Sequence, residues 1–455
     1  MEKTIYDKLL QLSAAIKKAI DDGISTGSLQ PELTAGRRWK VDKFEYTDGG
    51  ITAFGATGED YSKKTWTWAS VGVAESLNKF NEYNVALDHL SGTFTNRKDL
   101  ETDLKSFGRK VIRLYLNSPH VEESEIDNLI TIFQKNLRGE PVTYGATIEL
   151  TGVVLQSDRI NIGDGILIRH PKKDDMEKDF TECAGNPRMF FPHPSAILNI
   201  EILSDQVYEI QKKVEQALAI LRLFRVGSVK YLSYQVYSES ITDVMASGHL
   251  RSGDRFLAAH EKYLLKFEDD LKLTNFWFKV IELIPQSFYD ATVTSIDHTT
   301  IAYNRYTDAL LHNGVLERRI TNAIMGLEAL FFKADGEAQE LSYRLRLRVG
   351  KLLGLVGFDP HEVSKRIKDA YEIRSTFTHG GHLDDKKKNK LKIKYDNPNN
   401  LFLSVLDYLR SSLIINIIID NEKDEFIDLI DGSLLDTKME SQLTSTFSSA
   451  MELLG

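Results

Sequence analysis

The sequence predicts an α+β protein, with strands gathered in its N-terminal half and helices dominating from about residue 205 onward. Two observations carry this prediction. Between about residues 37 and 170, short segments rich in β-branched and aromatic residues are separated by turn residues, a pattern typical of strands. After residue 205, apolar residues recur at three- and four-residue steps over long segments, which is typical of amphipathic helices.

The first 25 residues are expected to form one helix, because apolar residues line a single face. These residues are Ile5, Leu9, Leu12, Ile16 and Ile20. Strands are then expected in "WKVDKFEYTDGGITAFGAT", "TWTWASVGV", "TYGATIELTGVVL" and "INIGDGILIRH", the first of which is broken by a turn-like Asp-Gly-Gly. Helical segments at about 98–116 and 123–138 interrupt these strands.

The second half opens with a helix in "QVYEIQKKVEQALAILRLFRVG", followed by the strand-like "SVKYLSYQVYSES". Further helices are expected at about 254–284, 296–312, 315–333, 337–354, 359–379 and 399–420. These changes of character divide the chain into three parts: a β-rich mixed domain with an N-terminal helix at 1–200, a helical connecting region at 201–295, and a helical domain at 296–455.

Composition excludes several classes of protein. A net charge of -9 over 455 residues argues against a generally basic nucleic-acid binder, although a local basic site is compatible with it. The single cysteine, Cys183, rules out a disulfide framework and fits a reducing cytoplasm. The longest apolar run, "LIINIII" at 413–419, is far shorter than the roughly 20 residues that cross a bilayer. We therefore expect a soluble cytoplasmic protein that does not contact a membrane.

No spacing in the sequence is typical of a zinc or two-metal site, so no metal and no cofactor is expected. The phosphate-binding GxxxxGK[ST] loop and the GxSxG nucleophile elbow are also absent from the sequence.

The stretch "YEIRSTFTHGGHL" at 371–383 places Arg374 five residues before His379. The spacing alone is unspecific, because arginine precedes histidine at a similar distance at four other places. These are Arg113/His120, Arg188/His193, Arg255/His260 and Arg305/His312. The sequence around each pair must therefore decide which of them has a function.

Only the Arg374/His379 pair sits on a helix with clear signals at both ends. Asp359 is expected as the N-cap, with Pro360 at the first position and Glu362 at the third, and Gly380 or Gly381 is expected to end the helix. An apolar stripe runs along this helix and includes the position of Arg374; its apolar members are Val363, Ile367, Ala370 and Phe377. A guanidinium on a buried stripe is unfavourable unless it is paired or binds an anion.

Two arrangements could bring Arg374 and His379 together. Five residues of ideal helix turn through about 140°, so the two side chains would not share a face. Either the helix loosens near its glycines, or two copies of the chain meet so that their arginines and histidines gather at a dimer seam.

A purely structural interpretation explains the same residues, and the pattern alone favours it. Glu328 in "MGLEALFF" and Glu340 at the start of "EAQELSYRLRLRVGKLLG" are available as ionic partners for Arg374. A histidine beside a helix-ending Gly-Gly is often only a solvated or capping residue.

Three blocks in order, "ITNAIMGLEALFF", "EAQELSYRLRLRVGKLLG" and "IKDAYEIRSTFTHGG", resemble the HEPN superfamily, and most closely its ApeA-like branch. The resemblance covers roughly residues 296–425. The family motif of arginine, polar residue and histidine-glycine falls on Arg374, Ser375 and His379 with Gly380, although many members carry asparagine where this chain has Ser375. The resemblance implies a four-helix-type domain that dimerises and cleaves RNA without a metal.

The implied chemistry suits these residue types. The ribose 2′-hydroxyl would attack phosphorus as an internal nucleophile, which predicts selectivity for RNA over DNA. His379 would transfer the proton, and the fork of Arg374 would stabilise the phosphate charge. Ser375 would orient either group. Glu328, Glu340 and Arg344 are expected to support this site.

Basic residues are crowded near the motif. Arg344, Arg346, Arg348 and Lys351 lie on one predicted helix, and "DDKKKNKLKIK" at 384–394 follows the histidine. We expect a basic loop over 384–394 to hold RNA phosphates. The expected RNA contacts are Arg348, Lys351, Lys386, Lys387 and Lys388. The alternative is a solvated loop without a role in binding. The two aspartates that begin the run weaken its positive electrostatic potential.

The preferred hypothesis is a homodimeric HEPN endoribonuclease, an effector of antiviral defence or a toxin, controlled by an N-terminal domain that senses a phage-derived or cellular trigger. The tryptophans Trp39, Trp66 and Trp68 fit a core better than a base-stacking surface, but they are the best candidates for trigger recognition. One alternative is a non-catalytic RNA- or nucleotide-binding HEPN scaffold. Another is a structural or regulatory partner whose helices serve only for assembly.

Overall fold

A computed structural model describes most of the chain and divides it into two compact units. Unit 1 consists of Met1–Glu149, Asp164–Gln211 and Leu232–Leu250, and unit 2 consists of Leu150–Gly163, Lys212–Tyr231 and Arg251–Gly455. This division does not coincide with the predicted boundaries after residues 200 and 295. The described residues are 2–47, 50–65, 76–118, 120–163, 165–176, 178–179, 194–206, 208–238, 247–249, 261–294, 297–312, 314–333, 339–419 and 422–447.

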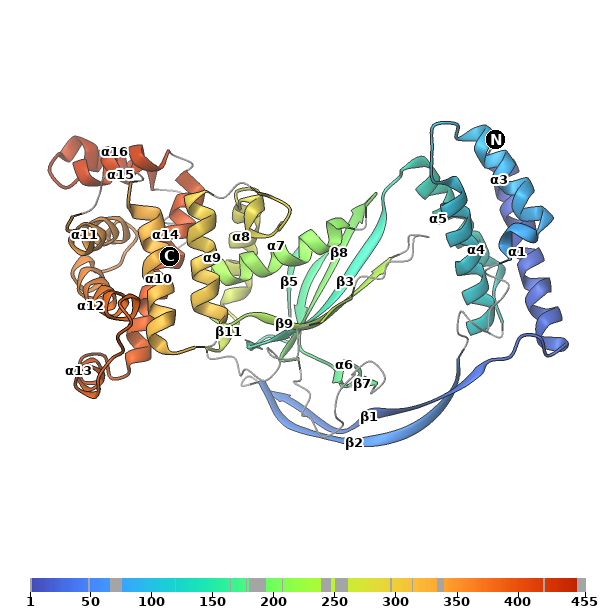
Figure 1. The fold of residues 1–455 in the computed structure, drawn as a ribbon, viewed down its shortest axis with the longest axis horizontal. Coiled ribbons are helices and arrows are strands. Elements are labelled where there is room, and N and C mark those ends of the chain that lie inside the picture. The colour runs from blue at the N-terminus through green and yellow to red at the C-terminus, as the bar shows by residue number, and fades with distance from the viewer. Residues whose placement is uncertain are drawn as a thin grey trace. The chain divides into compact units, whose positions relative to one another are not determined.

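Unit 1 contains a group of helices built around its first helix. The helix α1 (Glu2–Ser25) packs against α3 (Asn81–Thr93), α4 (Leu100–Asn117) and α5 (Glu123–Arg138) (Figure 1). The predicted apolar face of α1 is confirmed, because all five of its residues are buried. The ranges of α4 and α5 also agree with the prediction, whereas α3 was not predicted.

The strands of unit 1 form a long hairpin and an antiparallel sheet. In the hairpin, β1 (Glu32–Thr47) pairs with β2 (Gly50–Thr65), and the short β7 (Lys178–Asp179) pairs with β1. In the sheet, five strands follow one another in the order β10 (Ser247–His249), β9 (Lys230–Ser238), β3 (Val142–Thr151), β8 (Ala196–Ser204) and β6 (Ile166–Arg169). This arrangement confirms the predicted β-rich character of the N-terminal half and the α+β class.

Several predicted features of unit 1 fall outside the described residues. These are most of the predicted strand "TWTWASVGV", the first two residues of the Asp-Gly-Gly turn, and the side chains of Trp39, Trp66 and Trp68. Three short elements complete the described parts of the chain: η1 (Leu77–Lys79), α6 (Lys173–Met176) and η2 (Gln286–Phe288).

The first seven residues of the predicted helix at 254–284 lie outside the described chain, and the prediction is wrong at residues 263–265. Residues Tyr263–Leu265 form the strand β11, which pairs in parallel with β4 (Val153–Leu155). The helix α8 (Asp269–Val280) begins only afterwards and packs against β5 (Arg159–Gly163). The Asp269 carboxylate accepts the N–H of Lys266 at 2.8 Å, which stabilises the turn before the helix.

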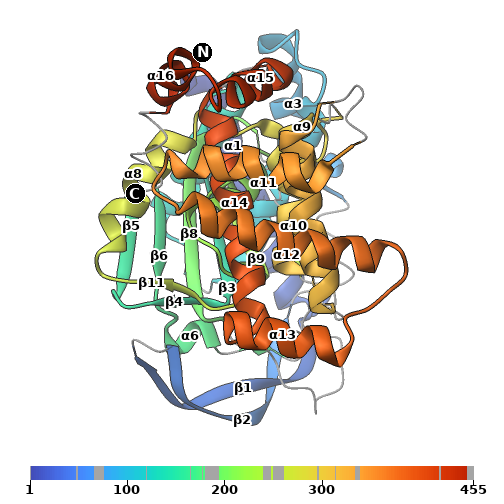
Figure 2. The same cartoon turned by 90° about the vertical axis from the view of Figure 1, so that its left-hand side faces the viewer.

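The rest of unit 2 is a helical bundle centred on α10 (Leu316–Phe331). This helix packs against α9 (His298–Leu311), α12 (Pro360–Thr378) and α14 (Pro398–Ile419) (Figure 2). Gly326 permits the close approach, because a Cβ at this position would lie 2.6 Å from Leu409 on α14. The remaining helices of unit 2 are α7 (Tyr208–Phe224, its first turn in unit 1), α11 (Leu341–Gly354), α13 (Asp385–Tyr395), α15 (Lys423–Gly432) and α16 (Thr437–Thr446).

The predicted apolar run at 413–419 belongs to a longer apolar helix. By length and composition α14, with a mean hydropathy of 1.6 over its most apolar window, is able to cross a membrane. Most of this window is buried inside the protein, against α9, α10 and α12. The burial fits the core helix of a soluble protein, in which the apolar residues face neighbouring helices instead of lipid.

Candidate functional site

The helix α12 begins and ends as its sequence predicts. At its start the Asp359 carboxylate accepts the N–H of His361 at 2.9 Å. At its end Gly380 adopts a φ of 78°, and the N–H groups of Gly380 and Gly381 donate to the carbonyls of Phe377 and Thr376 at 3.0 and 2.9 Å. These two bonds form a Schellman motif, which needs a residue that tolerates the left-handed conformation. The helix stays regular up to Thr378, so the predicted loosening within one chain is wrong.

Arg374 lies at the edge of the buried face of α12. Its Nη2 donates to Oε2 of Glu328 on α10 at 3.0 Å, and its side chain is 26% exposed. The buried residues of the face are Val363, Ile367, Ala370 and Ile373, whereas the predicted member Phe377 is half-buried. The stripe is therefore confirmed in its first three members, and its last position is Ile373.

Tyr371 completes a cluster with Arg374 and Glu328. The guanidinium carbon of Arg374 lies 5.5 Å from the centre of the Tyr371 ring. Burial raises the pKa of Glu328. The charge of Arg374 and a hydrogen bond from Tyr371 lower this pKa, but the effect of burial is larger. Burial, together with the nearby Glu328 carboxylate, also raises the pKa of Tyr371. Tyr371 is not among the predicted site residues, although its position three residues before Arg374 on the same helix face is a usable signal.

His379 is exposed at the C-cap of α12. Its backbone N–H donates to the carbonyl of Ser375 at 3.3 Å, and the Ser375 side chain is half-buried. Among the described residues, no hydrogen bond or ion pair connects the His379 side chain with Arg374 or Ser375. A single chain therefore does not bring the three predicted catalytic side chains into one bonded group.

The three residues expected to support the site have different positions. Glu328 is the ionic partner of Arg374, which is one of the two partners that the sequence predicted. Glu340 is the exposed N-cap of α11, and within the described chain it forms no ion pair with Arg374. Arg344 is exposed on the first turn of α11, where its N–H donates to the carbonyl of Glu340 at 3.0 Å.

Arg348 is not available to RNA, and its predicted role is wrong. Its side chain is 2% exposed, and its Nε and Nη2 donate to the two carboxylate oxygens of Asp431 at 2.9 and 2.7 Å. Its Nη1 donates to the carbonyl of Phe331 at 2.6 Å. Arg348 is therefore a buried structural residue that connects α10, α11 and α15. The sequence did not reveal this because Asp431 lies 83 residues further along the chain.

Lys351 is also engaged within unit 2. Its ammonium group pairs with the carboxylate of Glu440 on α16, and its side chain is only 18% exposed. Contact with RNA phosphates would require this ion pair to break, so Lys351 is poorly placed for the predicted role.

The lysine run at 384–394 is a helix, and the predicted loop is wrong. Asp384 is the N-cap of α13, with its carboxylate accepting the N–H of Lys387 at 2.7 Å. Leu391 and Tyr395 are buried at a four-residue spacing, which anchors the helix. The predicted contacts Lys386, Lys387 and Lys388 are exposed, as are Lys390 and Lys392. The side chains of Lys394 and Tyr395 both bond to Asp369, so α13 is attached to α12.

Within the described part of the chain, no group of three or more His, Cys, Asp or Glu side chains is placed to hold a metal ion. The chain matches no protein-family model, no curated protein and no solved structure.

Proposed function

We propose that this protein is a metal-independent HEPN endoribonuclease that cleaves RNA through attack of the ribose 2′-hydroxyl on the adjacent phosphate. The observation that carries the proposal is the end of α12. There His379 is exposed at the C-cap, one turn beyond an arginine that is held by Glu328 and still 26% exposed. The resemblance of residues 296–425 to the HEPN superfamily points to the same two side chains.

The two side chains have complementary tasks in this reaction. An exposed imidazole accepts the proton of the 2′-hydroxyl or returns one to the leaving oxygen. The guanidinium of Arg374 stabilises the additional negative charge on the phosphate oxygens. Glu328 fixes the orientation of that guanidinium, and Ser375, half-buried beside it, orients the phosphate or the histidine.

The complete site is proposed to form between two copies of the chain. Because α12 is regular up to Thr378, it holds the side chains of Arg374 and His379 on different faces. A symmetric pair of chains repeats the same surface on both partners, so the histidine of one copy can meet the arginine of the other. This homodimer would also give a partner to the His379 side chain, which forms no hydrogen bond or ion pair within the described chain.

A basic helix beside α12 is the proposed path for RNA. Five exposed lysines lie on α13: Lys386, Lys387, Lys388, Lys390 and Lys392. Lysines that face solvent attract the phosphate backbone and release counterions without reading sequence. Since Asp369 ties α13 to the helix that carries the proposed catalytic residues, RNA bound there is held close to α12.

The wider role rests on the family resemblance. We propose a cytoplasmic toxin or antiviral-defence effector whose unit 1 restrains cleavage until a phage-derived or cellular trigger binds. The second candidate function is a non-catalytic RNA- or nucleotide-binding scaffold. One observation favours this alternative, namely that Arg374 already has an ionic partner in Glu328.

Incubation of the purified protein with total RNA in excess EDTA is expected to produce cleavage products carrying 2′,3′-cyclic phosphate ends. Arg374→Ala is expected to abolish the products, and Arg374→Lys, which keeps a charge beside Glu328, to reduce them strongly because lysine lacks the bidentate fork. Lys368→Ala, an exposed change on the same helix, serves as the control. Equal cleavage by all four proteins would refute the site, and RNA binding without cleavage would support the scaffold.

Mixing two inactive variants tests the two-chain site. Arg374→Ala and His379→Ala, unfolded and refolded together, are expected to recover about a quarter of the wild-type rate, because half of the dimers are mixed and each has one intact site. Each variant refolded alone provides the control. No recovery despite mixed dimers on native mass spectrometry would contradict an arginine–histidine pair shared across the seam.

A further inference from the structure

Unit 2 contains a cavity of about 780 Å³ that the proposed RNA cleavage does not use. The cavity lies between the end of α7, the helix α8 and the middle of α14. Its volume is typical of pockets that enclose small ligands, which range from about 300 to 1,000 Å³. Five cationic side chains and two carboxylates line it, so its local charge is opposite to the net charge of the whole protein. The charged residues are Arg225, Glu261, Lys262, Lys272, Lys279, Asp407 and Arg410.

One wall of the cavity is the polar face of α8. Lys272, Asn275 and Lys279 are exposed there at spacings of three and four residues, so they follow one another along a single face. Lys262 faces the same space from the strand side and is also exposed. Within the described chain, neither Lys262 nor Lys272 pairs with a carboxylate. These two lysines are therefore free to donate to an incoming anion.

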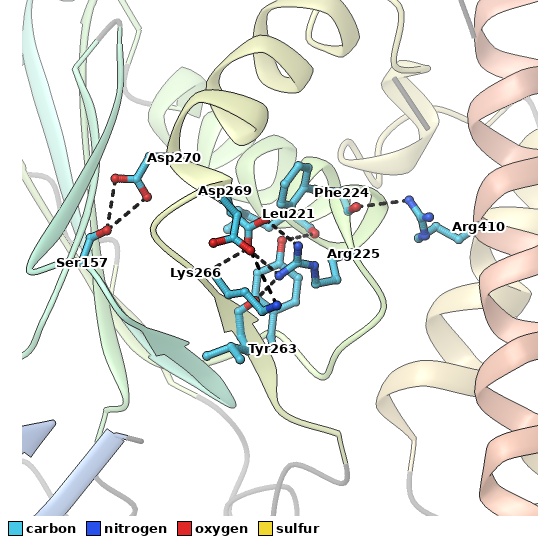
Figure 3. A network of polar contacts seen from close by, with 11 residues as sticks. Ser157, Leu221, Phe224, Arg225, Tyr263, Lys266, Asp269, Asp270 and Arg410 are labelled. Atoms are coloured by element: carbon cyan, nitrogen blue, oxygen red, sulfur yellow. Dashed lines mark hydrogen bonds and ion pairs between the residues drawn. The ribbon is translucent and has the colours of Figure 1, made fainter. Parts of the chain in front are cut away.

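Two arginines that line the cavity are each bonded to a carboxylate of the chain. Arg225 forms a bidentate pair with Asp269, with both nitrogen–oxygen distances at 2.7 Å, and the Asp269 side chain is 3% exposed (Figure 3). Arg410 is held by Asp407 at 2.7 Å and donates to the carbonyls of Leu223 and Phe224 at 2.9 and 3.1 Å. Both guanidinium groups are thus oriented by bonds within the chain before any ligand arrives, which lowers the entropic cost of binding.

The cavity also offers an aromatic surface. The rings of Phe224 and Phe276 meet edge to face at 5.4 Å, and Phe224 is half-buried at the cavity wall. A flat heterocycle can pack on such a ring, as bases do on aromatic side chains. Lysines for phosphate and an aromatic ring for a base thus line one cavity.

We propose that this cavity binds a nucleotide, with its phosphates on Lys262 and Lys272 and its base against Phe224. A nucleotide fits better than an RNA strand, because the site is a pocket of small-ligand volume and not a groove that follows a backbone. The site does not depend on the proposed nuclease activity, since it shares no residue with Arg374, Ser375 or His379.

The test uses the full-length protein and the four common ribonucleoside triphosphates, with inorganic triphosphate as a probe that lacks the base. At least one nucleotide is expected to raise the melting temperature in a concentration-dependent manner and to give a measurable Kd by calorimetry. Lys262→Gln and Lys272→Gln are each expected to weaken binding about tenfold. Phe224→Leu is expected to weaken nucleotide binding but not the binding of inorganic triphosphate.

The matched control is Lys386→Gln with Lys390→Gln, which removes two exposed lysines from α13 and leaves the cavity unchanged. Unchanged nucleotide affinity in this control, together with loss in the cavity variants, supports the site. The proposal is overturned if none of the four nucleotides binds, or if the control weakens binding as much as the cavity variants do. It is also overturned if only an RNA oligonucleotide binds and the two cavity lysines are needed for it.

Discussion

Replacing His379 with alanine is expected to lower the rate of RNA cleavage about 10²- to 10⁴-fold, the usual contribution of a positioned general acid or base. The free energy of unfolding is expected to stay within about 0.5 kcal/mol of the wild-type value. Both expectations follow from the exposed position of His379 at the end of α12. His379 is exposed at the C-cap, and the two hydrogen bonds of the Schellman motif that ends α12 join backbone groups of other residues.

A histidine three residues further on provides the control for this prediction. His382 is exposed and lies just after the same glycine turn, so His382→Ala removes an imidazole from nearly the same surface. Cleavage would be followed under single-turnover conditions, and stability by urea denaturation monitored with circular dichroism. Wild-type cleavage by His379→Ala, or an equal loss in both histidine variants, would remove His379 from the proposed mechanism.

Asp431→Ala is expected to destabilise unit 2 by about 3 kcal/mol, at the lower end of the range for breaking a buried ion pair. The change removes the carboxylate that accepts two hydrogen bonds from the guanidinium of Arg348, whose side chain is 2% exposed. The loss stays at the lower end because the Asp431 side chain is itself 43% exposed and water can enter the vacated space. The carbonyl of Phe331 remains as an acceptor for Arg348.

A second aspartate on α15 provides the matched control. Asp428 pairs with Lys333, but its side chain is 66% exposed, so Asp428→Ala is expected to change stability by less than about 1 kcal/mol. The urea midpoint at an unchanged m-value measures both effects. If the two variants lost the same small amount, Arg348 would not need Asp431, and its role in joining α11 to α15 would be wrong.

The accuracy of the sequence predictions depended on how local the determining interactions are. The limits of α12 were predicted closely because Asp359, Pro360 and the two glycines act within one turn of the helix ends. The apolar face of α1 was predicted completely for the same reason, since the spacing along one helix decides it. The lysine run was wrongly predicted as a loop, although Asp384 was a visible N-cap signal.

Spacing along the sequence does not reveal interactions between distant segments. From the sequence, either Glu328 or Glu340 could be the ionic partner of Arg374. The packing of α10 on α12 brings Glu328 to it. The sequence predicted that Arg348 binds RNA, whereas this arginine is buried and paired with Asp431 on α15. The sequence by itself determined which residues carry suitable chemistry and where α12 ends. Tertiary structure decided which charges are paired and buried, because an ion pair depends on which helices pack together, and spacing along the chain does not contain that information.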